Sequence, residues 1–308
     1  MLEIISGTVD FYLEKETAVA MGKFDGIHTG HRRLLEEVLE QKEKGLKACV
    51  FTFDPSPNLL FGLSDNKMIT TREEKRRLFE RMGIDILIEF PLTFETASIP
   101  PEKFVVDCLA RQMNARFIAA GTDLSFGDGG RGDANLLRLM APDLGMEVKT
   151  IDKVCVDGIE VSASLIRTKV EAGDMEAVER FLGMPYPVMG TVVHGNHVGS
   201  GLGFPTVNLL PEADKLLPPN GVYESEVFYR GKRLNGISNV GYKPTVTAER
   251  LLGVETYLYD FSEDIYGEYI EVYLKSFRRP EKRFADLSAL KAQLLQDIEG
   301  GRPQKGKK

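Results

Sequence analysis

The chain has 308 residues, of which 43% are hydrophobic, and its formal net charge is −7. This length predicts two domains, and the composition allows ordinary globular cores. The charge is uneven: residues 1–183 carry 23 basic and 31 acidic side chains, a net −8, whereas residues 184–308 carry 16 and 15, a net +1. Neither half has the basic character of a nucleic-acid-binding protein, so we expect no nucleic-acid partner.

The sequence also predicts neither a membrane-spanning helix nor a signal peptide. No stretch approaches the ~20 apolar residues of a membrane helix, so we expect no membrane partner. The N-terminus, MLEIISGTVDFYLEKE, has no basic region followed by an apolar one, which predicts no signal peptide. The three cysteines form no CxxC pair, and such an odd, scattered set is untypical of a disulfide framework. We therefore expect a cytoplasmic protein.

The first half of the chain alternates short buried strands with amphipathic helices. Strands are predicted at residues 17–21, 47–53, 85–90, 116–121 and 146–152. Helices are predicted at residues 32–44, 71–83, 100–113 and 133–144. Thr71 and Glu74 form a capping box at the start of the second of these helices, which is basic. This alternation predicts an α/β fold with a parallel, doubly wound sheet.

The pattern changes in the second half. Asp157-Gly158 between apolar runs predicts a hairpin, and two short helices follow. Residues 188–277 then contain closely spaced strands with turn signals, which predict a small antiparallel β-barrel. A final helix is predicted at residues 286–298. We therefore predict a first domain over residues 1–183 and a second over residues 184–308.

A turn rich in glycine and histidine, GKFDGIHTGH at residues 22–31, follows the first predicted strand. Ligands of open parallel sheets bind at the carboxyl ends of the strands, and the free N–H groups of a helix N-terminus there favour phosphate. The imidazoles of His28 and His31 add donors that can stabilise charge as pyrophosphate leaves. A His-x-x-His metal site is the alternative, but no third ligand lies nearby in the sequence.

A second glycine-rich segment, GSGLGFPTVN, covers residues 199–208. Thr206 and Asn208 alternate along an extended run, so both side chains reach one face, and their oxygens suit a nucleotide-bound Mg²⁺. The segment is not a P-loop, because it lacks GKS or GKT. Without its context, this segment is better explained as an ordinary loop that enters a strand.

Together these segments resemble two known motifs in order. The first is similar to the GxFDGxHxGH signature of nucleotidyltransferases and the second to the GRxLGFPTAN motif of riboflavin kinases, as both occur in bacterial bifunctional riboflavin kinase/FMN adenylyltransferases (FAD synthetases). Further similar segments are GTDLSFG at 121–127, GD at 132–133, VSASLIR at 161–167, GVY at 221–223, NVGYKPT at 239–245, VE at 254–255, DIYG at 264–267 and RPE at 279–281. The resemblance spans about residues 17–297.

The resemblance implies an activity and a site for each half. The second domain would phosphorylate riboflavin with ATP to FMN, and the first would adenylylate FMN with ATP to FAD and pyrophosphate, with Mg²⁺ as cofactor. The implied ATP-binding residues of the first domain, with His28 and His31 catalytic, are Gly22, Phe24, Asp25, Gly26, His28, His31, Asp123, Ser162, Ser164 and Arg167. Those of the second domain are Gly199, Gly201, Gly203, Thr206 and Asn208, the last two as Mg²⁺ ligands. Glu255 is the implied general base, and the implied flavin-binding residues are Asn239, Gly241, Arg279 and Phe284.

The sequence departs from the family pattern at a few positions. Ser200 stands where the riboflavin kinase motif has Arg, which removes a cation beside the predicted phosphate loop. The other departures are Ser56, Leu124, Ser125, Ala163, Lys243 and Tyr257. Three other hypotheses remain open: an enzyme with one live activity, a flavin-binding regulatory or storage protein, and an enzyme that adenylylates another phosphorylated acceptor.

Overall fold

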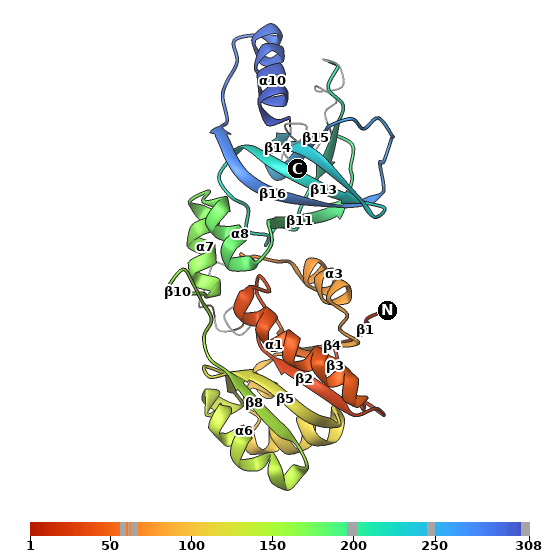
Figure 1. The fold of residues 1–308 in the computed structure, drawn as a ribbon, viewed down its shortest axis with the longest axis vertical. Coiled ribbons are helices and arrows are strands. Elements are labelled where there is room, and N and C mark those ends of the chain that lie inside the picture. The colour runs from red at the N-terminus through yellow and green to blue at the C-terminus, as the bar shows by residue number, and fades with distance from the viewer. Residues whose placement is uncertain (56–59, 61, 63–66, 196–202, 245–249, 303–308) are drawn as a thin grey trace. The chain divides into compact units, whose positions relative to one another are not determined.

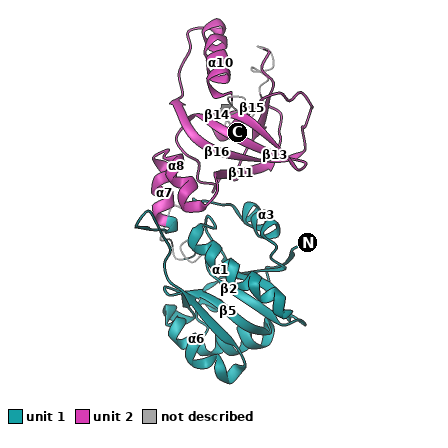
Figure 2. Cartoon of the chain, in the orientation of Figure 1, with its two compact units in different colours: residues 1–163 teal, residues 164–308 magenta. Residues whose placement is uncertain are grey.

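The structure, a computed structural model, describes all residues except 56–59, 61, 63–66, 196–202, 245–249 and 303–308. The chain divides into two compact units, residues 1–163 and 164–308 (Figure 2). The division falls at the start of helix α7 (Ala163–Glu171), so α7 and α8 (Met175–Leu182) belong to unit 2. The boundary between residues 183 and 184 stays a prediction.

Unit 1 is built on a six-stranded parallel sheet in the order β1-β4-β3-β2-β5-β8. Its strands are β1 (Glu3–Ser6), β2 (Thr17–Met21), β3 (Lys47–Asp54), β4 (Ile86–Pro91), β5 (Ala115–Gly121) and β8 (Glu147–Ile151). Two further pairings join β6 (Ser125–Phe126) to β7 (Gly132–Asp133) and β9 (Cys155–Val156) to β10 (Ile159–Glu160). The helices are α1 (Thr29–Glu40), η1 (Gln41–Lys44), α3 (Arg72–Met82), α4 (Phe94–Ala97), α5 (Pro101–Lys103), η2 (Phe104–Gln112), η3 (Asp128–Gly130), α6 (Ala134–Met140) and η4 (Pro142–Leu144).

Helices cover both faces of this sheet, because its central strands are apolar throughout. All five residues of β2 are buried. Val19 and Met21 join a core cluster with Phe104 of η2 and Leu137 of α6. The alternate residues of the strand belong to the opposite face, which α1 covers (Figure 1). The predicted doubly wound sheet is thereby confirmed.

The strand order reverses at the middle of the sheet. From β2 the chain proceeds outward through β3 to β4 and then returns to place β5 on the other side of β2. Loops that follow the two strands at such a reversal diverge and leave a crevice at the carboxyl edge, where ligands of open α/β sheets bind. Residues 22–28 follow β2, and Asp123 follows β5, so both predicted segments lie at this edge.

Unit 2 is a curled, six-stranded antiparallel sheet in the order β11-β16-β13-β14-β15-β12 (Figure 1). The amide N of Val193, just after β11, donates to the carbonyl O of Asn208 in β12 at 2.9 Å, so the two edge strands meet. The strands are β11 (Tyr186–Thr191), β12 (Thr206–Leu209), β13 (Gly221–Tyr229), β14 (Lys232–Pro244), β15 (Arg250–Leu258) and β16 (Tyr269–Pro280). The predicted small antiparallel barrel is thereby confirmed.

Two helices pack on this barrel. Helix α10 (Leu287–Gly301), the predicted final helix, is held where Arg279 pairs with Asp297 (Nε to Oδ1, 2.9 Å) and where the Tyr259 hydroxyl donates to the carbonyl O of Ile298 at 2.7 Å. Helix α8 buries an apolar face against β11 and β16. Within the described ranges, no helix combines the length and the apolar composition that a membrane span requires.

Candidate active sites

The loop between β2 and α1 is held in an uncommon backbone conformation. Phe24 and Ile27 have φ angles of +50° and +45°, although neither is glycine. Non-glycine residues in this region cost of order 1–3 kcal/mol each and persist only where the surroundings hold them. Both side chains are fully buried, and their burial offsets this cost. The loop therefore fixes the start of α1 in one position.

Hydrogen bonds tie the same loop to the segment that leads into α3. The Oδ1 atom of Asp25 accepts from the amide N of Ile69 at 2.9 Å, and the amide N of Gly26 donates to Oγ1 of Thr70 at 3.0 Å. Thr71 then caps α3 through the predicted capping box with Glu74. Asp25 and Gly26 thus hold the loop in place, and their predicted contact with ATP stays a prediction.

The two histidines of the motif lie against each other at the first turn of α1. His28 is the N-cap residue, and its Nδ1 accepts from the amide N of His31 at 3.3 Å. The imidazole rings are stacked, with centroids 3.7 Å apart and planes 19° from parallel. A Cβ at Gly30 would lie 3.2 Å from Nδ1 and Cε1 of His28, so glycine leaves room for this ring.

Both imidazoles are neutral near neutral pH. Burial lowers the pKa of His28 to about 4, although the nearby Asp123 carboxylate raises it. Burial also lowers the pKa of His31 well below 6.5, assisted by repulsion from His28 and Lys75. Because Nδ1 of His28 accepts a hydrogen bond, its proton is on Nε2. The buried Nδ1 of His31 has no hydrogen-bond partner among the described residues.

We expect the first unit to lose stability as the pH falls from about 6.5 to about 4. The folded-state pKa of His28 lies below its unfolded value of 6.5. In this window the unfolded chain therefore binds more protons than the folded chain. As the pH falls, the contribution of His28 lowers the free energy of unfolding by up to about 3 kcal/mol. The measurement is urea unfolding at about pH 7 and about pH 4.5. His28→Asn keeps a capping acceptor and should show a shallower dependence; an unchanged dependence would contradict the low pKa.

The other predicted residues of the first site lie in different parts of the fold. Asp123 follows β5 and is close enough to His28 to raise its pKa. Gly121 makes room for Asp123, since a Cβ there would lie 2.8 Å from Oδ1. Ser162 is near the end of unit 1, whereas Ser164 and Arg167 are in α7 of unit 2. Their roles, and that of Gly22 in the loop, stay predictions.

The barrel gathers four of the predicted kinase residues, Thr206, Asn208, Asn239 and Glu255, on one face. Oγ1 of Thr206 donates to Oε1 of Glu255 at 2.7 Å. Asn208 lies opposite Glu255 across β12 and β15, and Asn239 lies opposite it across β14 and β15. Side chains directly opposite in antiparallel strands share a face, as do residues two apart in one strand. The Glu255 carboxylate therefore lies between the amides of Asn208 and Asn239, and the Thr206 hydroxyl is hydrogen-bonded to it.

The oxygen atoms of Thr206 and Asn208 fit a magnesium ion. Mg²⁺ takes hard oxygen ligands and usually keeps water or substrate phosphates in several positions, so a hydroxyl and an amide suffice as protein ligands. No group of three His, Cys, Asp or Glu side chains in the described part of the chain could hold a metal ion by itself. A bound nucleotide would thus have to supply further ligands.

A cleft of about 190 Å³ opens beside this face. Its lining includes Pro205, Thr206, Leu258, Phe261, Asp264 and Tyr266. Apolar side chains share the walls with polar and acidic ones, among them Ser262, Glu263 and Asp264. Thr206 contributes a hydroxyl that is already directed to Glu255. The cleft thus lies next to the Thr206–Glu255 pair.

Two of the predicted flavin-binding residues lie near one carboxylate. Oε2 of Glu281 accepts from Nδ2 of Asn220 at 3.2 Å, and its Oε1 lies 3.5 Å from Nδ2 of Asn239. A Cβ at Gly241 would lie 2.0 Å from Oε1 of Glu281, so a side chain there would displace this carboxylate.

The remaining predicted residues of the second domain are placed less directly. Arg279 is paired with Asp297, and Phe284 is partly buried in the segment that joins β16 to α10. Flavin binding by these two residues stays a prediction. Gly203 is described, with a φ angle of +92°, whereas Gly199, Ser200 and Gly201 lie outside the described residues.

The fold and the two sites define a class of protein: a two-domain enzyme that works on nucleotides. Family models match both parts of the chain, FAD synthetase at residues 12–165 and riboflavin kinase at residues 182–303. The chain therefore belongs to the bifunctional riboflavin kinase/FMN adenylyltransferase family, as predicted from its motifs.

Individual relatives cover nearly the whole chain. The bifunctional riboflavin kinase/FMN adenylyltransferase of Escherichia coli strain K12 is 34% identical over 282 residues, which are 91% of this chain and 90% of the relative. The enzyme of the same description from Listeria monocytogenes is 33% identical over 293 residues, 94% and 93% of the two chains. A crystal structure described as a macrolide-efflux protein from Streptococcus pneumoniae has a TM-score of 0.82 and 29% identity, covering 97% of each chain.

Proposed function

We propose that this protein makes FAD from riboflavin in two ATP-dependent steps. The domain at residues 184–308 phosphorylates riboflavin to FMN, and the domain at residues 1–183 adenylylates FMN to FAD. One observation carries the proposal: a single chain holds both the stacked His28–His31 pair at a strand-order reversal and the hydrogen-bonded Thr206–Glu255 pair in a barrel. The family to which the chain belongs supports the same two reactions.

In the kinase step, Glu255 is the proposed general base. Its carboxylate accepts the proton of the riboflavin 5′-hydroxyl as that oxygen attacks the γ-phosphorus of ATP, and the bond from the γ-phosphorus to the bridging oxygen breaks to release ADP. The hydrogen bond from Thr206, 2.7 Å long, orients this carboxylate. Thr206 and Asn208 would hold a Mg²⁺ ion, which when bound offsets the negative charge of the ATP phosphates.

In the adenylyl-transfer step, His28 and His31 act as neutral donors. A phosphate oxygen of FMN attacks the α-phosphorus of ATP, and the bond to the β-phosphate breaks to release pyrophosphate. The acceptor phosphate is already ionised, so no base is needed. Preorganised donors aimed at the phosphate oxygens are what this transfer requires. Asp123, Ser162, Ser164 and Arg167 are the proposed further ATP contacts in this step.

The rival functions are less well supported. A riboflavin kinase match over residues 182–303 favours a flavin acceptor over another phosphorylated acceptor. A regulatory or storage protein would bind flavin without a carboxylate oriented by Thr206. We place the enzyme in the cytoplasm, where its three free cysteines would stay reduced. Its proposed small-molecule partners are riboflavin, FMN, FAD and ATP.

Fragments test the division of labour between the domains. Residues 164–308 retain α8, whose buried Val178, Phe181 and Leu182 pack on the barrel. We expect this fragment to convert riboflavin, ATP and Mg²⁺ to FMN without forming FAD, and the full chain to continue to FAD, as resolved by chromatography. A folded fragment that forms FAD would contradict the assignment. A full chain that binds riboflavin and forms neither product would favour the regulatory protein.

A further inference from the structure

Lys75 extends from the face of α3 that is turned toward the histidine loop. Phe79, one helical turn further along, is fully buried and packs edge to face on Phe24, with ring centroids 5.5 Å apart. Phe24 in turn packs on His31 at 5.0 Å. Residues four apart share a helix face, and helical side chains lean toward the N-terminus. The Lys75 side chain is therefore directed to the end of α3 where Asp25 and Ile69 join the loop to the helix.

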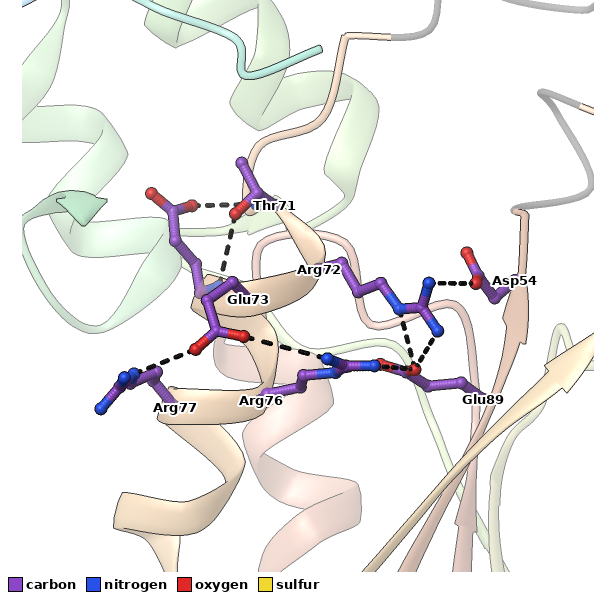
Figure 3. Close-up of polar contacts among 8 residues, drawn as sticks. Asp54, Thr71, Arg72, Glu73, Arg76, Arg77 and Glu89 are labelled. Carbon is purple, nitrogen blue, oxygen red and sulfur yellow. Dashed lines mark hydrogen bonds and ion pairs between the residues drawn. The ribbon is translucent and has the colours of Figure 1, made fainter. Parts of the chain in front are cut away.

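The arginines beside Lys75 are fully engaged by carboxylates (Figure 3). Glu89, whose side chain is 3% exposed, accepts from Nε and Nη2 of Arg72 at 2.8 and 2.6 Å and from Nε and Nη2 of Arg76 at 2.9 and 2.6 Å. Arg72 also pairs with Asp54 at 3.0 Å. Burial alone would raise the pKa of Glu89, but the bonds from Arg76 and Arg72 lower it below its usual range. Glu89 is thus an anion matched by these two cations.

Lys75 differs from these arginines because its ammonium has no carboxylate partner among the residues that the structure describes. In the described part of the chain it forms neither an ion pair nor a side-chain hydrogen bond. Burial lowers its pKa, while Asp25, Glu89 and Asp54 oppose the shift from beyond bonding distance. A partly buried cation without a partner costs free energy. That cost is offset when an anionic ligand binds beside it.

The position of the Lys75 side chain beside His31 indicates that the anion it would bind is a phosphate. Lys75 is close enough to His31 to lower the pKa of that imidazole. Two elements therefore converge at the carboxyl end of β2: the N-terminus of α1, with its stacked histidines, and the first turns of α3, with Lys75. Since both histidines are neutral, Lys75 contributes a positive charge that the histidines do not supply.

We propose that Lys75 is a further phosphate-binding residue of the adenylyl-transfer site, where its ammonium donates to a phosphate oxygen of ATP or FMN beside His31. The proposal rests on the assignment of adenylyl transfer to the first domain. Transfer brings two anionic groups together, and a preorganised cation between them reduces their repulsion and stabilises the charge that develops. Lys75 neither gains nor loses a proton, so the bonds made and broken are those of the transfer itself.

The test compares Lys75→Met with Lys75→Arg in the full chain, with FMN, ATP and Mg²⁺ as substrates and FAD as the measured product. We expect Lys75→Met to lower kcat/KM by ~10²-fold and Lys75→Arg to recover part of this loss, because it restores the charge with different geometry. Arg77→Met is the matched control: Arg77 is exposed on the same helix, pairs with Glu73 at 3.2 Å, and its replacement should change kcat/KM less than about twofold.

The kinetic constants distinguish the sources of the phosphate. A rise in KM for FMN assigns Lys75 to the acceptor phosphate, and a rise in KM for ATP assigns it to the triphosphate. A fall in kcat alone assigns it to the α-phosphate of the adenylyl group in transfer. A loss smaller than about tenfold in Lys75→Met would overturn the proposal. If the wild-type protein forms no FAD from FMN, that result contradicts the proposed function. A loss that is confined to the Lys75 variants reports on the role of Lys75 instead.

Folding is monitored in the same samples. Riboflavin phosphorylation reports on the second unit, and thermal unfolding reports on the first. If Lys75→Met does not fold, Lys75→Gln replaces it in the comparison with Lys75→Arg. A purely structural role predicts that every variant folded at the assay temperature adenylylates FMN with wild-type KM and kcat, and this result would overturn the proposal.

Discussion

Replacing His31 by alanine should lower FAD formation from FMN and ATP by ~10²–10³-fold, the usual loss when one preorganised donor to a charged transition state is removed. The ring is stacked on His28 at 3.7 Å, and its buried Nδ1 has no partner among the described residues, so no protein hydrogen bond at this atom competes with a phosphate. His28→Ala should have a similar effect, with an added loss of stability of about 0.5–2 kcal/mol because His28 caps α1.

Riboflavin phosphorylation is the internal control for both histidine variants. It should proceed at the wild-type rate, because the histidines and the kinase residues lie in different units. Rates of FMN and FAD formation are measured separately, starting from riboflavin and from FMN. Wild-type adenylylation by either variant would remove that histidine from the proposed mechanism.

Replacing Glu255 by glutamine should lower the turnover of riboflavin phosphorylation by ~10²–10⁴-fold, the range typical of general-base loss. Glutamine keeps the shape and an oxygen that can accept the hydrogen bond from Thr206, but it cannot take a proton. Riboflavin affinity should therefore change little, and FMN supplied directly should still become FAD. The measurements are riboflavin binding, FMN formation from riboflavin, and FAD formation from FMN.

A second carboxylate in the barrel offers a matched control. Glu268, whose side chain is 40% exposed, pairs with Arg230 at 2.7 Å. Glu268→Gln should phosphorylate riboflavin normally. Unchanged FMN production by Glu255→Gln would exclude Glu255 as the base. If the wild-type protein binds riboflavin but forms no FMN, the kinase half is inactive, and Ser200→Arg is the substitution to test for recovery.

The sequence predicted most of the fold because its signals are local and strong. The central strands are buried on both faces and read as continuous apolar runs. The predicted hairpin is confirmed by β9 and β10, where Asp157 and Gly158 have φ angles of +52° and +76°. Strand β1 was missed, because its four residues are mostly exposed and are ordered only by parallel pairing with β4.

The first site was only partly predictable. The histidines were found because they are contiguous with the turn that presents them. Thr70 is 44 residues from Gly26, to which it bonds, and no local pattern announces such a contact. The helix at residues 71–83 was predicted to be basic, but only the fold shows that Glu89 engages Arg72 and Arg76, whereas Lys75 has no ion pair within the described residues. The neutrality of the histidines likewise depends on burial.

The central claim is that the two reactions occur at two separate sites. One measurement on His31→Ala and Glu255→Gln together tests this claim most directly. Starting from riboflavin, ATP and Mg²⁺, His31→Ala alone should stop at FMN, and Glu255→Gln alone should form almost no product. An equimolar mixture should form FAD, because FMN released by the first variant is adenylylated by the second. A mixture that accumulates FMN without FAD, although Glu255→Gln alone adenylylates added FMN, would contradict free passage of FMN between sites. If Glu255→Gln alone cannot adenylylate added FMN, the two reactions do not use separate residues.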